Sequence, residues 1–194
     1  MNHFFAYLFR MKYIRRWGLM RNSMDENLEE HSLEVAMLAH CLALIRRDVL
    51  GKPCDPDRVA AAALYHDVAE TLTGDLPTPV KYINDEFRES YRRIEEASRV
   101  KLLEMLPQEL RASYETLMAD CESDPEIFAL VKAADRLSAY IKCIGELNTG
   151  NREFQRASLQ TKEALDSMKL PEVDYFYEHF LESFRLSLHD MGEI

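Results

Sequence analysis

Four side chains able to bind a metal are spread along the sequence: His31, the adjacent pair His66 and Asp67, and Asp135. Two imidazoles and two carboxylates suit a divalent transition metal, and they favour six-coordination with room for water and substrate. Asp135 shares a helical face with apolar residues, where a carboxylate is costly to bury unless it is paired or binds a cation. The residue types therefore indicate a divalent metal site, provided that the fold brings these segments together.

Glu70 follows His66 by four residues and Asp67 by three. If this stretch is helical, that spacing places Glu70 on the same side of the helix as both. Adjacent helical residues are about 100° apart, so His66 and Asp67 can enter one cavity at the edge of a buried face. We therefore expect one imidazole and two carboxylates within a single helical turn, with Glu70 placed to move a proton as general acid or base.

Each of these residues, taken alone, also has an ordinary explanation. A neighbouring His and Asp such as 66–67 is often a surface or capping pair. His31 can be a histidine of a first helical turn with no ligand role. Asp135 can form a salt bridge with Lys132 or with Arg136.

The elements that must position these residues are predicted to be helical. Apolar residues recur at helical spacing along most of the chain, and no segment alternates as a strand would. Asn27, Asp55 and Asp124 are predicted N-caps, the last two preceding a proline in the first helical position. We predict helices over about 27–48, 55–70, 85–106, 107 onwards, 124–144 and 173–188, and a loop without regular helix over 73–79, where one glycine and two prolines lie. The sequence thus predicts an all-α bundle, with residues 1–194 forming one domain.

Composition restricts the class of partner. The 194 residues include 24 basic and 34 acidic side chains, giving a net charge of −10. An acidic chain is a poor general binder of polyanions, so we expect no nucleic acid polymer as a partner. A local basic cluster with no acid in it lies over residues 10–21, which leaves room for a small anion.

No apolar run is long enough to span a bilayer, and the first residues lack an export signal, so we expect no membrane partner and a cytoplasmic location. The four cysteines are far apart and are expected to be free thiols; they are Cys41, Cys54, Cys121 and Cys143.

The order of His31, His66-Asp67 and Asp135 resembles the H…HD…D pattern of HD-domain phosphohydrolases. Further segments are similar to those of the bacterial HD-domain 5′-deoxynucleotidase family, over nearly the whole chain; they are Arg15–Trp17, Asn27–Ser32, Tyr65–Glu70, Gly74–Lys81, Lys132–Asp135 and Asp174–Phe176. One departure is Arg136, where a smaller or neutral residue is expected, and it affects none of the four ligands.

The resemblance implies a single HD-domain helical bundle that hydrolyses deoxyribonucleoside 5′-monophosphates to deoxyribonucleoside and phosphate through a metal-activated water. It also implies one divalent ion per chain, cobalt or manganese, held by His31, His66, Asp67 and Asp135, and a homodimer. Arg16 would orient the phosphate, Trp17 would wall the sugar and base, and Asp75 would bond the 3′-hydroxyl. The remaining substrate contacts that it implies are His31, Asp67, Leu76, Pro77, Thr78 and Asp135, with Asp67 also counted among the catalytic residues.

The chemistry of Arg16 and Trp17 agrees with these roles. Arginine offers a rigid two-pronged donor for phosphate. Tryptophan can stack on any base, and its bulk against C2′ would leave no space for a ribose hydroxyl. Without the metal ligands, the simpler reading would be an exposed arginine beside a core tryptophan.

Two other functions stay open. Another HD phosphohydrolase, acting on deoxynucleoside triphosphates or guanosine tetraphosphate, would need more cations than Arg15, Arg16 and Lys81 near the motifs. A catalytically silent nucleotide-sensing module would have no need of Glu70 and every ligand. The C-terminal aromatic residues exceed what one helix face usually buries in a monomer, which favours a homodimer; they are Tyr175, Phe176, Tyr177, Phe180 and Phe184.

Overall fold

The computed structural model describes residues 1–81 and 83–192, without the side chains of Thr78, Asp120, Cys121 and Glu122. Within these residues the chain is helical and has no strand; its one extended pairing is a single bridge between Arg15 and Asn27. The all-α prediction is confirmed. No helix in the described part of the chain has both the length and the apolar character needed to cross a membrane.

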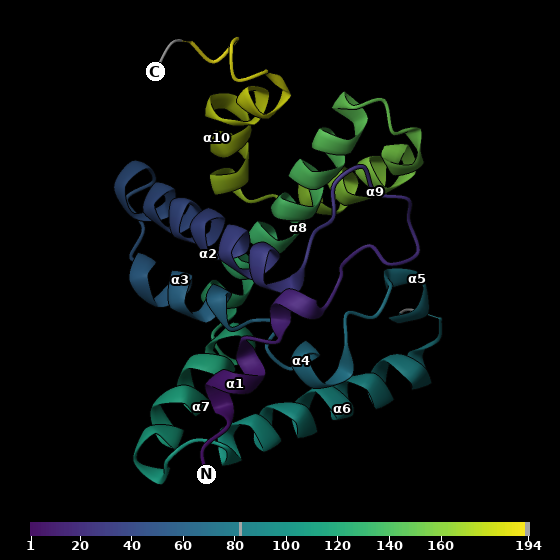
Figure 1. Cartoon of the computed structure of the whole chain (residues 1–194). Coiled ribbons are helices and arrows are strands. Elements are labelled where there is room, and N and C mark those ends of the chain that lie inside the picture. Colours follow the sequence, from purple (N-terminus) through teal and green to yellow (C-terminus); the bar gives the residue numbers. More distant parts are fainter. Residues whose placement is uncertain (82, 193–194) are drawn as a thin grey trace.

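Most elements follow one another through short connections, and the longest connection is the loop of residues 14–27 between η1 and α2 (Figure 1). The α-helices are α1 (Phe4–Leu8), α2 (Leu28–Leu44), α3 (Pro56–Leu64), α4 (Glu70–Thr73), α5 (Thr78–Lys81), α6 (Asp85–Glu104), α7 (Gln108–Ser123), α8 (Pro125–Asn148), α9 (Gln155–Asp166) and α10 (Pro171–His179). Shorter helical turns are η1 (Met11–Tyr13), η2 (Ile45–Val49), η3 (Arg152–Phe154) and η4 (Leu181–Arg185).

The predicted N-caps are confirmed. Asn27 Oδ1 accepts hydrogen bonds from the backbone N–H groups of Glu29 and Glu30, both at 3.0 Å, and Glu30 accepts one in return from Asn27 N at 3.1 Å. This reciprocal pair starts α2 at a defined residue and therefore sets where His31 lies. Asp55 and Asp124 cap α3 and α8 with their side chains, which accept from backbone N–H groups of the first turn.

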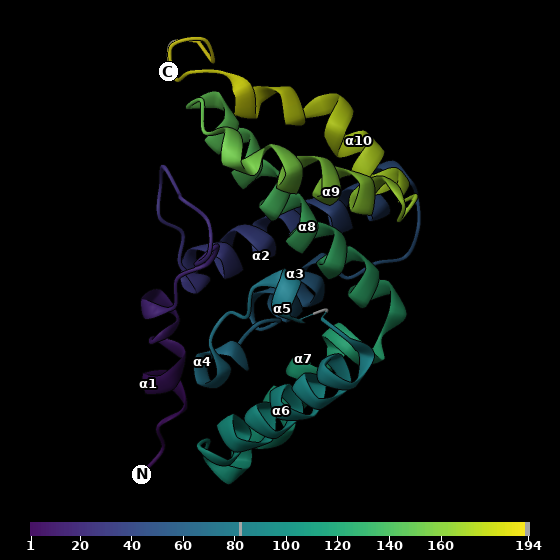
Figure 2. The same cartoon turned by 90° about the vertical axis from the view of Figure 1, so that its right-hand side faces the viewer.

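Two clusters of buried side chains hold the helices together. One cluster joins α2, α3, α8, α9 and α10, and it includes Val35, Leu137 and Phe176. The other joins α1, α6 and α7, together with Leu28 at the start of α2 and Val68 after α3. The two views place α6 and α7 at the N-terminal end of the molecule and α10 near the C-terminal end (Figures 1 and 2). The start of α2 and the segment after α3 therefore lie where the two clusters meet.

The helix predicted over 55–70 ends at Leu64, so this part of the prediction was wrong. The carbonyl of Ala63, which would accept from Asp67 N–H in an α-helix, instead accepts from Nδ1 of His66 at 2.7 Å. A side chain that competes for a backbone partner in this way ends the helix. Residues 65–69 form a turn, and Glu70 starts the separate helix α4.

Two other boundaries differ from the prediction. The loop predicted over 73–79 ends earlier, because Thr78 and Pro79 begin α5, where a proline in the first turn is tolerated. The final helix ends at His179 and is followed by η4, since Phe180 leaves helical geometry with φ −126°. The side chains beyond this point are largely exposed, so little packing supports a longer helix.

Candidate functional site

The segment after α3 and the first turn of α2 bring three predicted ligands together. His31, His66 and Asp67 each offer a ligand atom, and these atoms lie within 4.8 Å of one another. The Oδ2 atom of Asp67 is 3.0 Å from Nε2 of His66 and 3.8 Å from Nε2 of His31. His31 is fully buried, whereas Asp67 keeps 22% of its side chain exposed. The group is thus buried on one side and accessible on the other.

Asp135 approaches the same group from the middle of α8. Its Oδ1 atom lies 3.3 Å from Nε2 of His31, and its Oδ2 atom lies 2.6 Å from Nζ of Lys132. The salt bridge with Lys132 therefore exists and leaves the other oxygen facing the histidine. Arg136 points elsewhere and donates to the carbonyl of Ala164, joining α8 to α9.

Hydrogen bonds at the Nδ1 atoms indicate which ring nitrogen of each histidine carries the proton. Nδ1 of His66 bonds to the Ala63 carbonyl, which can only accept. Nδ1 of His31 lies 3.2 Å from Oγ of Ser138, whose hydroxyl donates to Glu34 at 3.1 Å. Both Nδ1 atoms are therefore donors, so in each neutral ring Nε2 holds the lone pair.

The two Nε2 atoms are buried and have no hydrogen-bond partner among the described residues. Nε2 of His31 lies 3.3 Å from Oδ1 of Asp135, and Nε2 of His66 lies 3.0 Å from Oδ2 of Asp67. Lone pairs and anionic oxygens that converge in this way need a cation, and a second bond from Nδ1 is the usual support of a metal-bound imidazole. The four residues fit a divalent metal.

The charges in this group are strongly coupled. Burial raises the pKa of Asp67 and of Asp135, but the neighbouring imidazoles, and Lys132 beside Asp135, outweigh it, so both carboxyl groups titrate below their usual range. Burial lowers the pKa of His66, yet the two carboxylates leave it above its usual value. Both carboxylates are thus anionic at neutral pH, and they favour a positive charge beside the Nε2 atoms of His31 and His66.

Arg16 and Trp17 reach this region from the loop before α2. Arg16 is not the exposed arginine of the simpler reading, since only 12% of its side chain is accessible, and its Nη1 atom lies 3.8 Å from Oδ2 of Asp67. Trp17 is half-buried, with its ring centroid 5.3 Å from that of Phe154. Both side chains donate to the buried carboxylate of Glu26, at 2.8 Å and 3.3 Å.

Glu70 lies beside the metal-binding group, although not on one helix with it as predicted. Its backbone N–H donates to the Asp67 carbonyl at 2.9 Å, which folds it back over the turn. Glu70, His66 and Asp67 line one cavity of about 160 Å³, with Lys81 and Glu95 on its rim. Burial and then the charges of Asp67 and Asp75 raise the pKa of Glu70 to about 9, so its carboxyl group is protonated at neutral pH.

The predicted sugar contacts follow α4. Gly74 has φ 77°, a value that favours glycine, and it turns the chain toward Asp75. Asp75 is half-buried; burial raises its pKa, and the charge of Arg16 acts in the opposite direction. Leu76 and Pro77 are also half-buried, and neither lines the cavity beside Glu70. The side chain of Thr78 lies outside the described residues.

Sequence reasoning missed Glu26 and the support that Ser138 gives to His31. Glu26 lies ten residues after Arg16 and meets it only because the loop closes on itself. Ser138 lies three positions after Asp135, a spacing that places it on the same helical face and was the one available signal.

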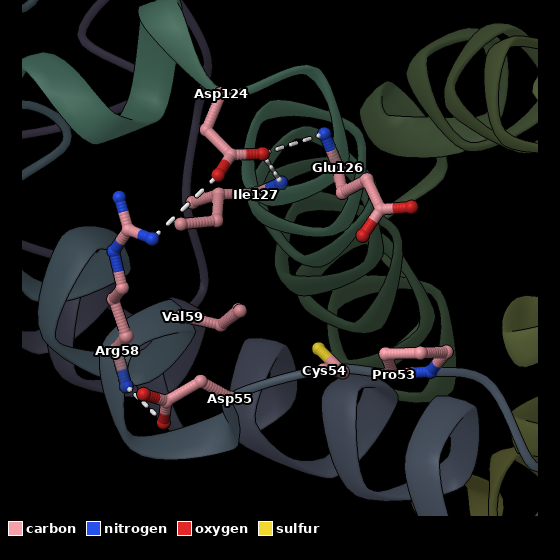
Figure 3. Close-up of a pocket in the computed structure, with 8 residues that line it drawn as sticks. All are labelled: Pro53, Cys54, Asp55, Arg58, Val59, Asp124, Glu126 and Ile127. Carbon is pink, nitrogen blue, oxygen red and sulfur yellow. Dashed lines mark hydrogen bonds and ion pairs between the residues drawn. The ribbon is translucent and has the colours of Figure 1, made fainter.

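A second cavity, of about 230 Å³, lies between the starts of α3 and α8, with none of the predicted site residues in its lining. Figure 3 shows its carboxylates engaged at helix ends: Asp55 accepts from Arg58 N, and Asp124 accepts from the first turn of α8. The side chain of Arg58 lies 3.8 Å from Asp124. The carboxylates of Asp55 and Asp124 thus serve the starts of α3 and α8, and Glu126 pairs with Arg46.

Comparison with known proteins adds a family and a fold. A family model described as 5′-deoxynucleotidase YfbR-like matches residues 3–184. The 5′-deoxynucleotidase of Erwinia tasmaniensis is 48% identical over 192 residues, covering 99% of this chain and 97% of that protein. The 5′-deoxynucleotidase YfbR of Shigella boydii is 46% identical over 192 residues, covering 99% and 96%.

Solved structures show the same fold. The crystal structure of an HD-domain phosphohydrolase from Listeria innocua aligns with a TM-score of 0.82 at 22% identity, covering 94% of this chain and 88% of that one. The HD phosphohydrolase DatZ of cyanophage S-2L, bound to dA and one catalytic Zn²⁺ ion, aligns with a TM-score of 0.60 at 24% identity, covering 92% and 96%. The predicted HD-domain bundle is confirmed.

Proposed function

The chain belongs to the YfbR-like 5′-deoxynucleotidase family, and from this membership we propose that it hydrolyses deoxyribonucleoside 5′-monophosphates to deoxyribonucleoside and phosphate. The observation that carries the proposal is the pair of buried Nε2 atoms of His31 and His66, which face two carboxylates without a hydrogen-bond partner in the described chain. Such a group serves a bound cation, and phosphate ester hydrolysis is chemistry that a cation accelerates.

The proposed ligands are His31, His66, Asp67 and Asp135, for one divalent ion per chain. We propose cobalt or manganese, because two imidazoles with two carboxylates favour six-coordination. When bound, such an ion neutralises phosphate oxygens and lowers the pKa of a bound water.

Arg16 is proposed to orient the phosphate. Its Nε atom is occupied by Glu26, while its Nη1 atom faces Asp67, so the free end of the guanidinium is directed at the candidate ligands. A planar donor held this way suits two phosphate oxygens at once. Asp67 therefore has two proposed roles, as ligand and as part of the phosphate-binding wall, and His31 and Asp135 line the same wall.

Glu70 is proposed to give a proton to the leaving 5′-oxygen. Breaking the P–O bond leaves negative charge on that oxygen, and a neutral carboxylic acid nearby can supply the proton. The pKa of Glu70, near 9, keeps the acid form at neutral pH, and its Oε2 atom is buried with no hydrogen-bond partner in the described structure.

The sugar and base are proposed to lie against Trp17, with Asp75 accepting from the 3′-hydroxyl and Leu76, Pro77 and Thr78 completing the pocket. Trp17 is the one tryptophan of the chain and adjoins the phosphate-orienting arginine. Its bulk would exclude a 2′-hydroxyl and leave base choice nearly free.

We also propose a single domain, a homodimer and a cytoplasmic location. Large apolar side chains remain exposed near the C-terminus, which supports a second copy as their cover; they are Phe180, Phe184, Leu186, Leu188 and Met191. Sedimentation velocity should give a dimer that Phe184→Glu converts to monomer. The cysteines Cys41, Cys54 and Cys143 are free thiols, as expected in a reducing compartment.

Chromatographic detection of released nucleoside tests the proposed reaction, with dAMP, AMP and dATP as substrates and cobalt or manganese added. We expect rapid conversion of dAMP, slow conversion of AMP and little of dATP. Preferred cleavage of dATP would support the triphosphohydrolase alternative instead, and binding of all three without cleavage would support the silent nucleotide-sensing module.

A further inference from the structure

We infer that Glu26 is the positioning residue that fixes Arg16 and Trp17 together, so that phosphate orientation and sugar selection depend on one buried carboxylate. The inference rests on the proposed function for the roles of Arg16 and Trp17. The contact itself is independent of that function, because it is a property of the loop before α2.

Glu26 uses a different oxygen for each partner. Its Oε1 atom accepts from Nε of Arg16 at 2.8 Å, and its Oε2 atom accepts from Nε1 of Trp17 at 3.3 Å. Glu26 is only 7% exposed, so water competes little for either bond. The guanidinium and the indole are therefore held in one relative orientation by a single side chain.

A carboxylate beside a phosphate site needs a reason, because like charges repel. Here the carboxylate takes the Nε edge of Arg16 and leaves the Nη groups for another acceptor. Nη1 lies 3.8 Å from Oδ2 of Asp67, at the candidate metal site. Glu26 also offsets the cost of burying the arginine charge, which would otherwise favour a solvent-exposed rotamer.

The backbone of the loop closes around this contact. The Arg16 N–H donates to the Glu26 carbonyl at 2.9 Å, and the bridge between Arg15 and Asn27 lies next to it. Trp17 has φ 57°, a left-handed conformation that costs a non-glycine residue energy and persists only when its surroundings impose it. Met20 N–H and Asn22 Nδ2 both donate to the Trp17 carbonyl and help to impose it.

The far end of the loop is fixed as well. Glu146, fully buried in α8, accepts from the backbone N–H groups of Ser23 at 2.8 Å and Met24 at 3.3 Å. Lys142 and Asn151 donate to the same carboxylate. The loop is thus closed at its base and held against α8, and Glu26 fixes on it the two side chains that would meet the substrate.

Glu26→Gln tests the inference with little change in volume. A glutamine offers one oxygen where the carboxylate offers two, so one of the two contacts must be lost. We expect kcat for dAMP to fall by about tenfold to a hundredfold, as misplacement of an orienting group does, with metal content unchanged. The dAMP/AMP preference should fall in the same variant. Glu163→Gln is the matched control: it removes the same charge from an exposed side chain of α9, and both readouts should stay within about twofold of the native values.

A double variant separates positioning from a general structural effect. If Glu26 acts through Arg16, adding Glu26→Gln to Arg16→Ala should lower kcat for dAMP by less than about twofold further. A full additional loss of kcat in the Arg16→Ala background would overturn the inference, since Glu26 would then act without Arg16.

Fluorescence gives a readout that needs no turnover. Trp17 is the sole tryptophan, so emission excited at wavelengths that tyrosine does not absorb reports on its indole alone. We expect a lower steady-state anisotropy in Glu26→Gln than in the native protein or in Glu163→Gln. Glu26→Asp keeps the charge but is too short to reach both partners. We expect it to lower anisotropy and kcat as Glu26→Gln does, and it replaces that variant if the glutamine protein does not fold. Native anisotropy and native kcat in these variants would refute the positioning role. Absence of dAMP cleavage by the wild-type protein would overturn the proposed function instead, and the anisotropy would still decide whether Glu26 fixes Trp17.

Discussion

Ser138 Oγ lies 3.2 Å from Nδ1 of His31, although the two residues are 107 positions apart in the chain. The contact joins α8 to the first turn of α2 and turns Nε2 of His31 toward Asp135, 3.3 Å away. Helix α8 therefore carries one candidate ligand, Asp135, and orients another, His31. The geometry of the metal-binding group thus depends on how α2 packs on α8.

Removal of this hydroxyl should weaken metal binding while leaving every ligand in place. We expect Ser138→Ala to lower the affinity for manganese or cobalt by about tenfold to a hundredfold, the usual cost of losing such a support. Isothermal titration calorimetry measures it. Ser32→Ala is the control, because Ser32 is also buried and adjoins His31, but its hydroxyl has no hydrogen-bond partner in the described chain. Equal affinities in both variants would show that Ser138 does not support the site.

Glu70→Gln should keep the metal and lose turnover. The amide mimics the neutral acid in shape but cannot give up a proton, so kcat for dAMP should fall by about a hundredfold to ten-thousandfold. Metal content, measured by mass spectrometry after dialysis, should equal that of the native protein. Loss of metal along with activity would make Glu70 a ligand or a support of one, contrary to its proposed role.

The raised pKa of Glu70 also makes the metal-free fold dependent on pH. Since the pKa of about 9 in the folded state exceeds the ordinary value, the folded state binds more protons between these values and loses stability as pH rises through them. Urea titration of the metal-free protein should therefore show Glu70→Gln gaining stability over the native chain between pH 5 and pH 8. A constant difference across this range would contradict the buried acid.

Glu146 should give the stability of the fold a pH dependence of the opposite sign to that from Glu70. Burial raises its pKa, but bonds from Lys142, Asn151 and Ser23 outweigh burial and lower it to about 2. Its contribution is complete above the ordinary carboxyl pKa and is lost as pH falls toward 2. Glu146→Gln should thus cost on the order of 3 kcal/mol at pH 7, and the cost should shrink below about pH 4. Urea unfolding at several pH values tests this, with the exposed Glu163→Gln as a control that should change little.

Trp17→Ala should relax the choice of sugar. Opening space at C2′ is expected to reduce the dAMP/AMP ratio of kcat/KM at least roughly tenfold, which corresponds to about 1.4 kcal/mol of discrimination. The rate with dAMP should fall too, since stacking on the base is lost. A native ratio in this variant would assign the exclusion of ribose to another residue.

Structural features that depend only on residues close together in the chain could be predicted from the sequence. The caps Asn27, Asp55 and Asp124 act within three positions of themselves, so the starts of α2, α3 and α8 could be predicted. The end of α3 could not, because it depends on the His66 ring taking the Ala63 carbonyl, a choice that periodicity does not record.

The candidate ligands could be listed from residue type, yet their supports could not. Whether Asp135 pairs with Lys132 or faces His31 was open in the sequence, and the structure has it do both. Glu26 carries no motif, and its contact with Arg16 exists only after the loop has closed. Partners set by tertiary packing are thus the part of the site that sequence reasoning misses.

One metal ion, held by His31, His66, Asp67 and Asp135, is proposed to be required for hydrolysis of deoxyribonucleoside monophosphates. The most direct test is to strip the protein of metal, add manganese or cobalt stepwise, and measure dAMP turnover at each ratio of metal to chain. Turnover should be absent at the start, rise linearly and level off at one equivalent, and His66→Ala should stay inactive throughout. Full turnover by the stripped protein, or a rise that continues to two equivalents, would show that hydrolysis does not depend on one ion at this site.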